Sequence, residues 1–163
     1  MYFQNREEAG FTRAQASEEM DYITESRIEK IENGVTQAQP SDVVAMARVY
    51  KKPELCNYYC VNECEIGQKM VPEIRISSLS EIVLGLLSSM NALDAHKNRL
   101  IDITMDGKID PSELHDFAKI KLGLDRLAIT IEGLRLWCDK MVAEGHIDEN
   151  EYESLCKSLE IKK

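Results

Sequence analysis

Apolar residues recur at every seventh position through the second half of this 163-residue chain. Such spacing keeps apolar side chains on one side of an α-helix and is typical of helices that pair along a seam. It predicts two long helices, each roughly 40–50 Å long at 1.5 Å per residue. The series are Leu79, Leu86, Leu93 and Leu100 beside Ile82, Val83, Met90 and Ile103, and then Phe117, Leu124, Ile131 and Cys138 beside Ile120, Leu127, Leu134 and Met141.

Joined by a short turn, two such helices form a long antiparallel, coiled-coil-like hairpin. A short third helix is indicated by Tyr152, Leu155, Cys156 and Leu159. A rod of two or three helices leaves apolar surface uncovered, so we expect self-association, most simply a homodimer. The same hairpin is a possible docking site for a partner protein. His96 falls on the apolar side of the first long helix, where a polar residue is expected to set the register.

The first 64 residues predict five short helices with sharp ends. Glycine suits the left-handed conformation that ends a helix, whereas threonine and serine hydroxyls cap the start of one. Proline fits the first helical turn. The expected helix ends are Gly10 and Gly34, the expected N-caps are Thr12, Thr24 and Ser41 after Pro40, and Pro53 is expected to begin the fifth helix.

A change of pattern divides the chain. Gly67 and Pro72 interrupt the helical pattern of "EIGQKMVPEIRI" and predict a linker over residues 65–76. The expected fold is therefore all-α, with an N-terminal domain over residues 1–64 and a helical hairpin over residues 77–163. Few glycines and prolines (8 and 4) and an aromatic content of 6% agree with helices rather than short strands.

The segments "REEAGFTRAQASEEM", "ITESRIEKIENG" and "PSDVVAMARVY" carry a resemblance over residues 6 to about 60. Their order resembles the Cro/repressor-type helix-turn-helix of the XRE family, a lambda-repressor-like five-helix domain. The resemblance implies a transcriptional regulator that binds double-stranded DNA as a dimer. In that arrangement the second helix crosses the DNA backbone and residues 25–32 enter the major groove.

The resemblance also implies DNA-contacting residues. Arg13, at the start of the second helix, would lie near a phosphate or a base. Glu32 matches a glutamate that is mainly structural in the family. The candidate DNA-binding residues are Arg13, Thr24, Glu25, Ser26, Arg27, Glu29 and Lys30.

Charge supports a second interpretation. The chain carries a net charge of −9, and residues 1–50 hold five basic and nine acidic side chains, a net charge of −4. Phosphate neutralisation supplies most non-specific DNA affinity, so an acidic surface weakens it. The alternative is a protein-interaction module, in which the acidic surface of the same fold binds a basic partner protein rather than DNA.

Two motifs resemble metal sites. Cys56, Cys60 and Cys64 share a helical stripe, which allows core or inter-domain packing, a soft metal ion or a redox switch, but the fourth ligand of a zinc site is missing. Residues 102–113, "DITMDGKIDPSE", match much of a calcium-loop template, with Asp106 at its fifth position. Residues 144–152 repeat residues 106–114, with Lys140 where the first ligand would stand. We therefore expect two helix-to-helix connectors, capped by Asp110 with Glu113 and by Asp148 with Glu151, and no metal site.

Other functional classes find no support in the sequence. There is no phosphate-binding glycine loop, no GxSxG and no HExxH, so we expect no enzyme and no cofactor. No apolar run is long enough to span a bilayer. Five cysteines without a disulfide framework indicate reduced thiols and a cytoplasmic location.

Overall fold

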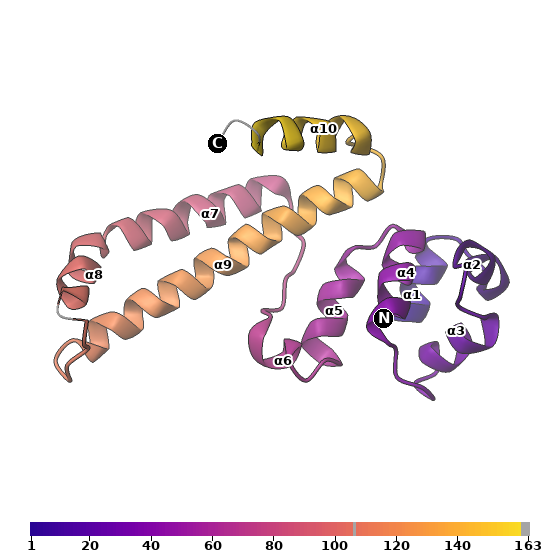
Figure 1. Ribbon diagram of the computed structural model, residues 1–163, viewed down its shortest axis with the longest axis horizontal. Helices are drawn as coiled ribbons and strands as arrows, with labels where there is room; N and C mark the ends of the chain where they lie inside the picture. The colour runs from indigo at the N-terminus through magenta and orange to yellow at the C-terminus, as the bar shows by residue number, and fades with distance from the viewer. Residues whose placement is uncertain (106, 161–163) are drawn as a thin grey trace. The chain divides into compact units, whose positions relative to one another are not determined.

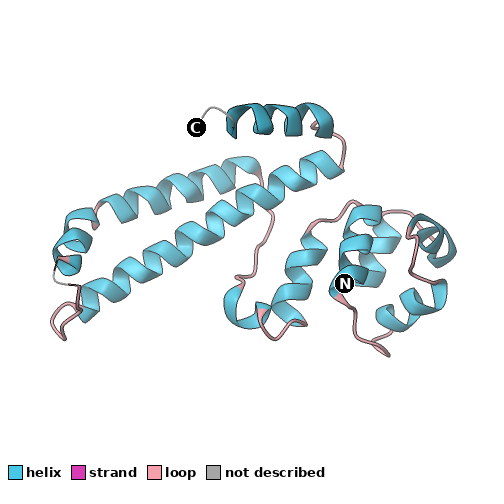
Figure 2. Cartoon of the chain, in the orientation of Figure 1, coloured by secondary structure: helices cyan, strands magenta, loops and turns pink. Residues whose placement is uncertain are grey.

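The computed structural model describes residues 1–105 and 107–160. These residues form ten helices and no strand, so the protein is all-α as predicted (Figure 2). Its internal contacts define two units, one of residues 1–73 with 136–163 and one of residues 74–135. The sequence-based division into residues 1–64, 65–76 and 77–163 stays a prediction about independent domains. Asp106 of the calcium-like loop lies outside the described residues.

Five short helices open the first unit. Thr12 and Thr24 cap two of them as predicted, because their hydroxyls accept the backbone N–H of Gln15 at 3.2 Å and of Arg27 at 3.3 Å. The predicted cap at Ser41 is wrong. That helix begins two residues earlier than predicted, at Pro40, with Gln39 as its N-cap. The helices are α1 (Tyr2–Glu8), α2 (Arg13–Glu19), α3 (Glu25–Glu32), α4 (Pro40–Tyr50) and α5 (Glu54–Asn62).

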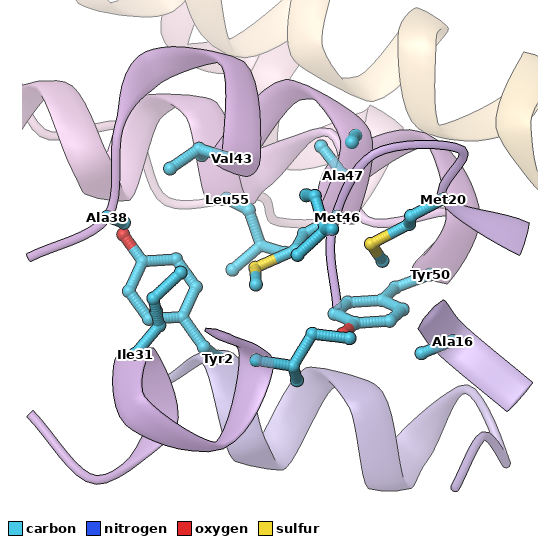
Figure 3. Packing of buried hydrophobic residues seen from close by; sticks show 13 residues of the cluster. Tyr2, Ala16, Met20, Ile31, Ala38, Val43, Met46, Ala47, Tyr50 and Leu55 are labelled. Atoms are coloured by element: carbon cyan, nitrogen blue, oxygen red, sulfur yellow. The ribbon is translucent and has the colours of Figure 1, made fainter. Parts of the chain in front are cut away.

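The core of this part lies where these helices meet (Figure 3). Each fully buried aliphatic side chain contributes about 1.5–3 kcal/mol relative to an exposed one, so this cluster fixes the helices against one another. α3 contributes Ile28 and Ile31, and α4 contributes Met46. The cluster contains Tyr2, Ala16, Met20, Ile23, Ile28, Ile31, Ala38, Val43, Ala45, Met46, Ala47, Tyr50 and Leu55.

A short helix interrupts the predicted linker. This helix, α6 (Gly67–Met70), packs against α5 so closely that a Cβ at Gly67 would lie 2.1 Å from the carbonyl oxygen of Cys60. Only glycine permits that backbone approach. Gly67 therefore packs two helices together and does not simply loosen a linker.

The second unit contains α7 (Leu79–Asp94), α8 (Lys97–Thr104) and most of α9 (Leu114–Ala143), and α10 (Glu149–Glu160) follows in sequence. The 30 residues of α9 make it about 45 Å long, as predicted. The first long helix is instead broken at His96, which precedes α8 as its N-cap residue. The expectation that His96 sets register within a continuous seam is therefore wrong.

α7 and α8 run antiparallel to α9 (Figure 1). Residue numbers rise along one side of the hairpin while those of the contacting residues fall along the other. A Cβ added to Gly85 would lie 3.4 Å from Cγ2 of Thr130, and one added to Gly123 would lie 3.8 Å from Cδ1 of Leu93. Farther along the hairpin, Arg99 Nε donates to Asp116 Oδ2 at 2.8 Å.

The two repeated connectors share their capping chemistry. Gly107 and Gly145 adopt positive φ angles of 71° and 77°. Asp110 Oδ1 accepts the backbone N–H of Glu113 at 3.1 Å, and Asp148 Oδ1 accepts that of Glu151 at 2.8 Å. The repeat thus ends one helix and caps the next, as predicted. Within the described ranges, no helix combines the length and apolarity needed to cross a membrane.

Candidate nucleic-acid interface

The turn between α2 and α3 is held at both ends. Met20 and Ile23 are buried in the core, with exposures of 0% and 2%. The Ser17 hydroxyl donates to the carbonyl of Ile23 at 2.8 Å. The exposed Tyr22 donates its hydroxyl hydrogen to the carbonyl of Ser41, on α4, at 2.7 Å. These contacts fix the direction in which α3 leaves the turn.

α3 has one buried side and one exposed side. Its isoleucines at positions 28 and 31 enter the core, which turns the opposite side of the helix outward. Four of the predicted DNA-binding residues therefore share an exposed face. They are Glu25, Ser26, Glu29 and Lys30.

A buried carboxylate ties α1, α2 and α3 together. The side chain of Glu32 is 1% exposed and accepts hydrogen bonds from Arg6 Nε at 2.6 Å and from Arg13 Nε at 2.8 Å. Burial by itself would raise the pKa of Glu32, but the two arginines outweigh burial and lower it. Glu32 is therefore a charged structural residue, the role that the family resemblance implies.

A second buried carboxylate holds Arg27. Asp42 on α4 is 3% exposed and accepts a two-fold hydrogen bond from the Arg27 guanidinium, through Nε at 3.0 Å and through Nη2. Asp42 also accepts the backbone N–H of Gln39 at 2.8 Å. Burial raises the pKa of Asp42, whereas Arg27 and the Gln39 amide lower it further than burial raises it. Sequence reasoning missed this pair, since the residues are fifteen positions apart and no local pattern links them.

The predicted DNA-binding residues thus differ in their surroundings. Arg13 and Arg27 are ion-paired but partly open, with side-chain exposures of 29% and 35%. Thr24 is used as a helix cap. In the part of the chain that the structure describes, Lys30 forms no ion pair. Arg13 and Glu25 also line an open hollow of about 530 Å³, together with Gly10 and Thr12.

The predicted cysteine stripe is only partly helical, because α5 ends at Asn62 and Cys64 follows it. Cys56, Cys60 and Cys64 are free thiols and partly buried. Cys56 packs against the core, and burial raises the pKa of its thiol. Cys64 Sγ accepts the backbone N–H of Gly67 at 3.4 Å. Among the described residues, no three His, Cys, Asp or Glu side chains are grouped closely enough to hold a metal ion.

Comparison with known proteins agrees with this geometry. A family model described as a helix-turn-helix domain matches residues 4–55, which run from within α1 through α2, α3 and α4 to the start of α5. No curated protein and no solved structure matches the chain. The matched segment contains the α2–turn–α3 unit and the Glu32 ion pairs that hold it. The N-terminal part of this chain is therefore a helix-turn-helix domain of the Cro/repressor type.

Proposed function

We propose that this protein is a sequence-specific DNA-binding transcriptional regulator that acts as a homodimer. The helix-turn-helix domain binds one half-site of double-stranded DNA, and the helical hairpin joins two copies. Five free cysteines fit the reducing environment of the cytoplasm. The observation that carries the proposal is the exposed face of α3, fixed by the core and by two buried carboxylates within a helix-turn-helix domain.

The proposed roles follow from which polar groups remain open. Glu25, Ser26 and Glu29 are proposed to contact base edges. A carboxylate accepts a hydrogen bond from cytosine N4, and a serine hydroxyl can hydrogen-bond to any of the bases. Lys30 is exposed and meets a phosphate. Thr24, as N-cap, presents the first turn of α3.

Arg13 and Arg27 are proposed as oriented phosphate or guanine contacts. A guanidinium has five N–H donors. Arg27 directs Nε and Nη2 to Asp42, and Arg13 directs Nε to Glu32 and Nη1 to Glu29 at 3.4 Å. Each arginine keeps donors that no protein group engages in the described part of the chain. The carboxylates therefore fix each guanidinium while leaving one edge for DNA.

Selection of bound duplexes from a randomised library, with the full-length protein at low salt, tests this proposal. The expected result is one enriched motif with two-fold symmetry, because a dimer reads two half-sites. Lys30→Ala should then weaken binding to all sequences and reduce the salt dependence by about one phosphate contact. Lys69→Ala, an exposed lysine on α6, is the matched control and should leave binding unchanged. Absence of any enriched motif, from folded protein, would contradict the proposal.

One observation favours a second candidate, a protein-interaction module. Arg13 and Arg27 are already neutralised by carboxylates, while Glu18, Glu19, Asp21, Glu25 and Glu29 are exposed around the same surface. Such a surface attracts a basic protein. Ligand identity separates the two candidates, because both are electrostatic and both weaken with salt. A folded dimer that enriches no duplex but binds a basic protein through α3 would support the second.

A further inference from the structure

Both long helices of the hairpin expose apolar side chains on a flank beside their contact. On α7, Val83, Leu87 and Met90 are 36%, 51% and 51% exposed. On α9, Leu124 and Ile131 are 46% and 43% exposed. Exposure near one half is expected of a side chain that lies next to a helix seam, covered on one side and open on the other.

Helical geometry places these two flanks on the same side of the hairpin. Successive residues turn by about 100° around a helix. The side of α7 that meets α9 includes Ile82 and Leu93. Going around the helix from that side, in the sense in which the chain winds, the exposed stripe follows after about 90°. On α9 the exposed stripe follows about 80° after the side that meets α7, again in the sense in which the chain winds.

Because α7 and α9 are antiparallel, these two rotations bring the stripes to one side rather than to opposite sides. They form a single apolar face, called the hairpin face below. Leu79, at 40% exposure, extends the α7 stripe. The hairpin face consists of Leu79, Val83, Leu87, Met90, Phe117, Leu124, Ala128 and Ile131.

The eight members of the hairpin face are apolar, and the charged residues Asp94, Lys121 and Arg135 border it, each four residues after one of its members. Since the face itself is apolar, the same face of a second copy is a matching surface for it. The exposed area of the eight side chains is on the order of 600 Å² per copy, so two copies would bury about 1,200 Å², at the lower limit of a stable interface. Met90 also lines a hollow of about 470 Å³, whose walls are Leu93, Leu100 and Leu127 together with the polar Asn91, Asp94 and Lys97.

We infer that a second copy of this chain packs against the hairpin face, so that two hairpins form a four-helix arrangement. The contact is isologous, with each copy contributing the same apolar residues. This inference deepens the dimer of the proposed function and names the surface that makes it. Its test uses no DNA, so its failure is distinct from a failure of DNA binding.

The test compares substitutions on and off the hairpin face within the same helix. Leu87→Glu lies on the face. Leu84→Glu, three residues earlier, is the matched control, because Leu84 is 67% exposed and points to the outer side of α7. On α9, Ile131→Glu is paired in the same way with Ile129→Glu, whose residue is 41% exposed on the other flank. Oligomeric state is measured for the full chain by sedimentation equilibrium, and helical content by circular dichroism.

The expected result is a dimeric parent protein, dimeric Leu84→Glu and Ile129→Glu variants, and Leu87→Glu and Ile131→Glu variants that dimerise at least tenfold more weakly with unchanged helical content. A monomeric parent protein would overturn the inference, since another segment or another protein would then cover the face. Equal weakening by on-face and control substitutions would overturn it as well. A dimer with this pattern that enriches no DNA would sustain the inference and contradict the proposed DNA binding.

Discussion

The carboxylate of Glu32, at the end of α3, lies 2.8 Å from Nε of Arg13, at the start of α2. The same carboxylate binds Arg6 of α1, whose side chain is 4% exposed. One acidic residue thus pairs with two arginines and joins three helices. A buried ion of one sign is costly unless its counter-ion stays in place, so the helix-turn-helix geometry depends on this single side chain.

Glu32→Gln is expected to destabilise the N-terminal domain by about 3 kcal/mol, because Arg6 would remain buried with its charge no longer balanced by Glu32. Urea unfolding followed by circular dichroism measures the change. Glu29→Gln is the control. Glu29 is 54% exposed and lies 3.4 Å from Arg13, so its removal should cost less than about 1 kcal/mol. Equal losses in the two variants would show that burial of Glu32 has no energetic consequence.

Acid should weaken the same domain through Glu32 and Asp42. The pKa values of both carboxyls are lowered in the folded protein from ordinary values of 4.5 and 3.8. A lowered pKa means that the folded state favours the charged form. The stabilisation is therefore fully present above the ordinary pKa and is lost as pH falls through the lower folded pKa.

Melting temperatures of the parent protein and of Asp42→Asn, measured from pH 7 to pH 3, check this dependence. At pH 7 the variant should melt at a lower temperature, because Arg27 loses its partner. The difference in melting temperature should narrow as pH falls from the ordinary pKa of 3.8 towards the lower pKa of folded Asp42, because the unfolded chain then takes up a proton that the folded protein resists. A gap that stays constant over the whole range would mean that the charge on Asp42 does not stabilise the fold.

The sequence predicted local features well and long-range polar contacts poorly. Thr12 and Thr24 cap their helices because capping depends on residues three apart, which a local pattern reveals. The Arg27–Asp42 pair joins α3 to α4 and depends on how two helices pack, which no local pattern contains. The exposed face of α3 was therefore predictable, but the neutralisation of its arginine was not.

In the hairpin, too, the sequence predicted some features and missed others. Heptad spacing predicted α9 and its length, because an apolar repeat sustained over about four heptads is compatible with few structures other than a long helix. It also predicted one continuous helix through His96, where the structure has a break before α8. The seventh-residue series of leucines from Leu79 to Leu100 continues across that break, so periodicity alone could not reveal it.

Gly67→Ala should destabilise the protein by about 2 kcal/mol, because the added Cβ would lie 2.1 Å from the Cys60 carbonyl oxygen and must push α6 away from α5. Thermal unfolding followed by circular dichroism measures the change. Gly123→Ala is the contrasting control. Its Cβ would meet Leu93 Cδ1 at 3.8 Å, an ordinary contact, and alanine favours a helix interior by about 0.5–1 kcal/mol over glycine. Equal behaviour of the two variants would rule out the close α5–α6 contact.

Tyr50→Phe should leave the protein as stable as before or raise its stability by about 1 kcal/mol. The Tyr50 hydroxyl is buried without a hydrogen-bond partner among the described residues, and burial raises its pKa to about 12. Removing an unsatisfied buried hydroxyl removes its desolvation cost while the ring keeps its place in the core. Tyr2→Phe is the matched control, because the Tyr2 hydroxyl donates to Glu63 Oε1 at 2.8 Å and its loss should cost about 1 kcal/mol. Urea midpoints compare the two, and a loss above about 1 kcal/mol in Tyr50→Phe would show that the Tyr50 hydroxyl does have a stabilising partner.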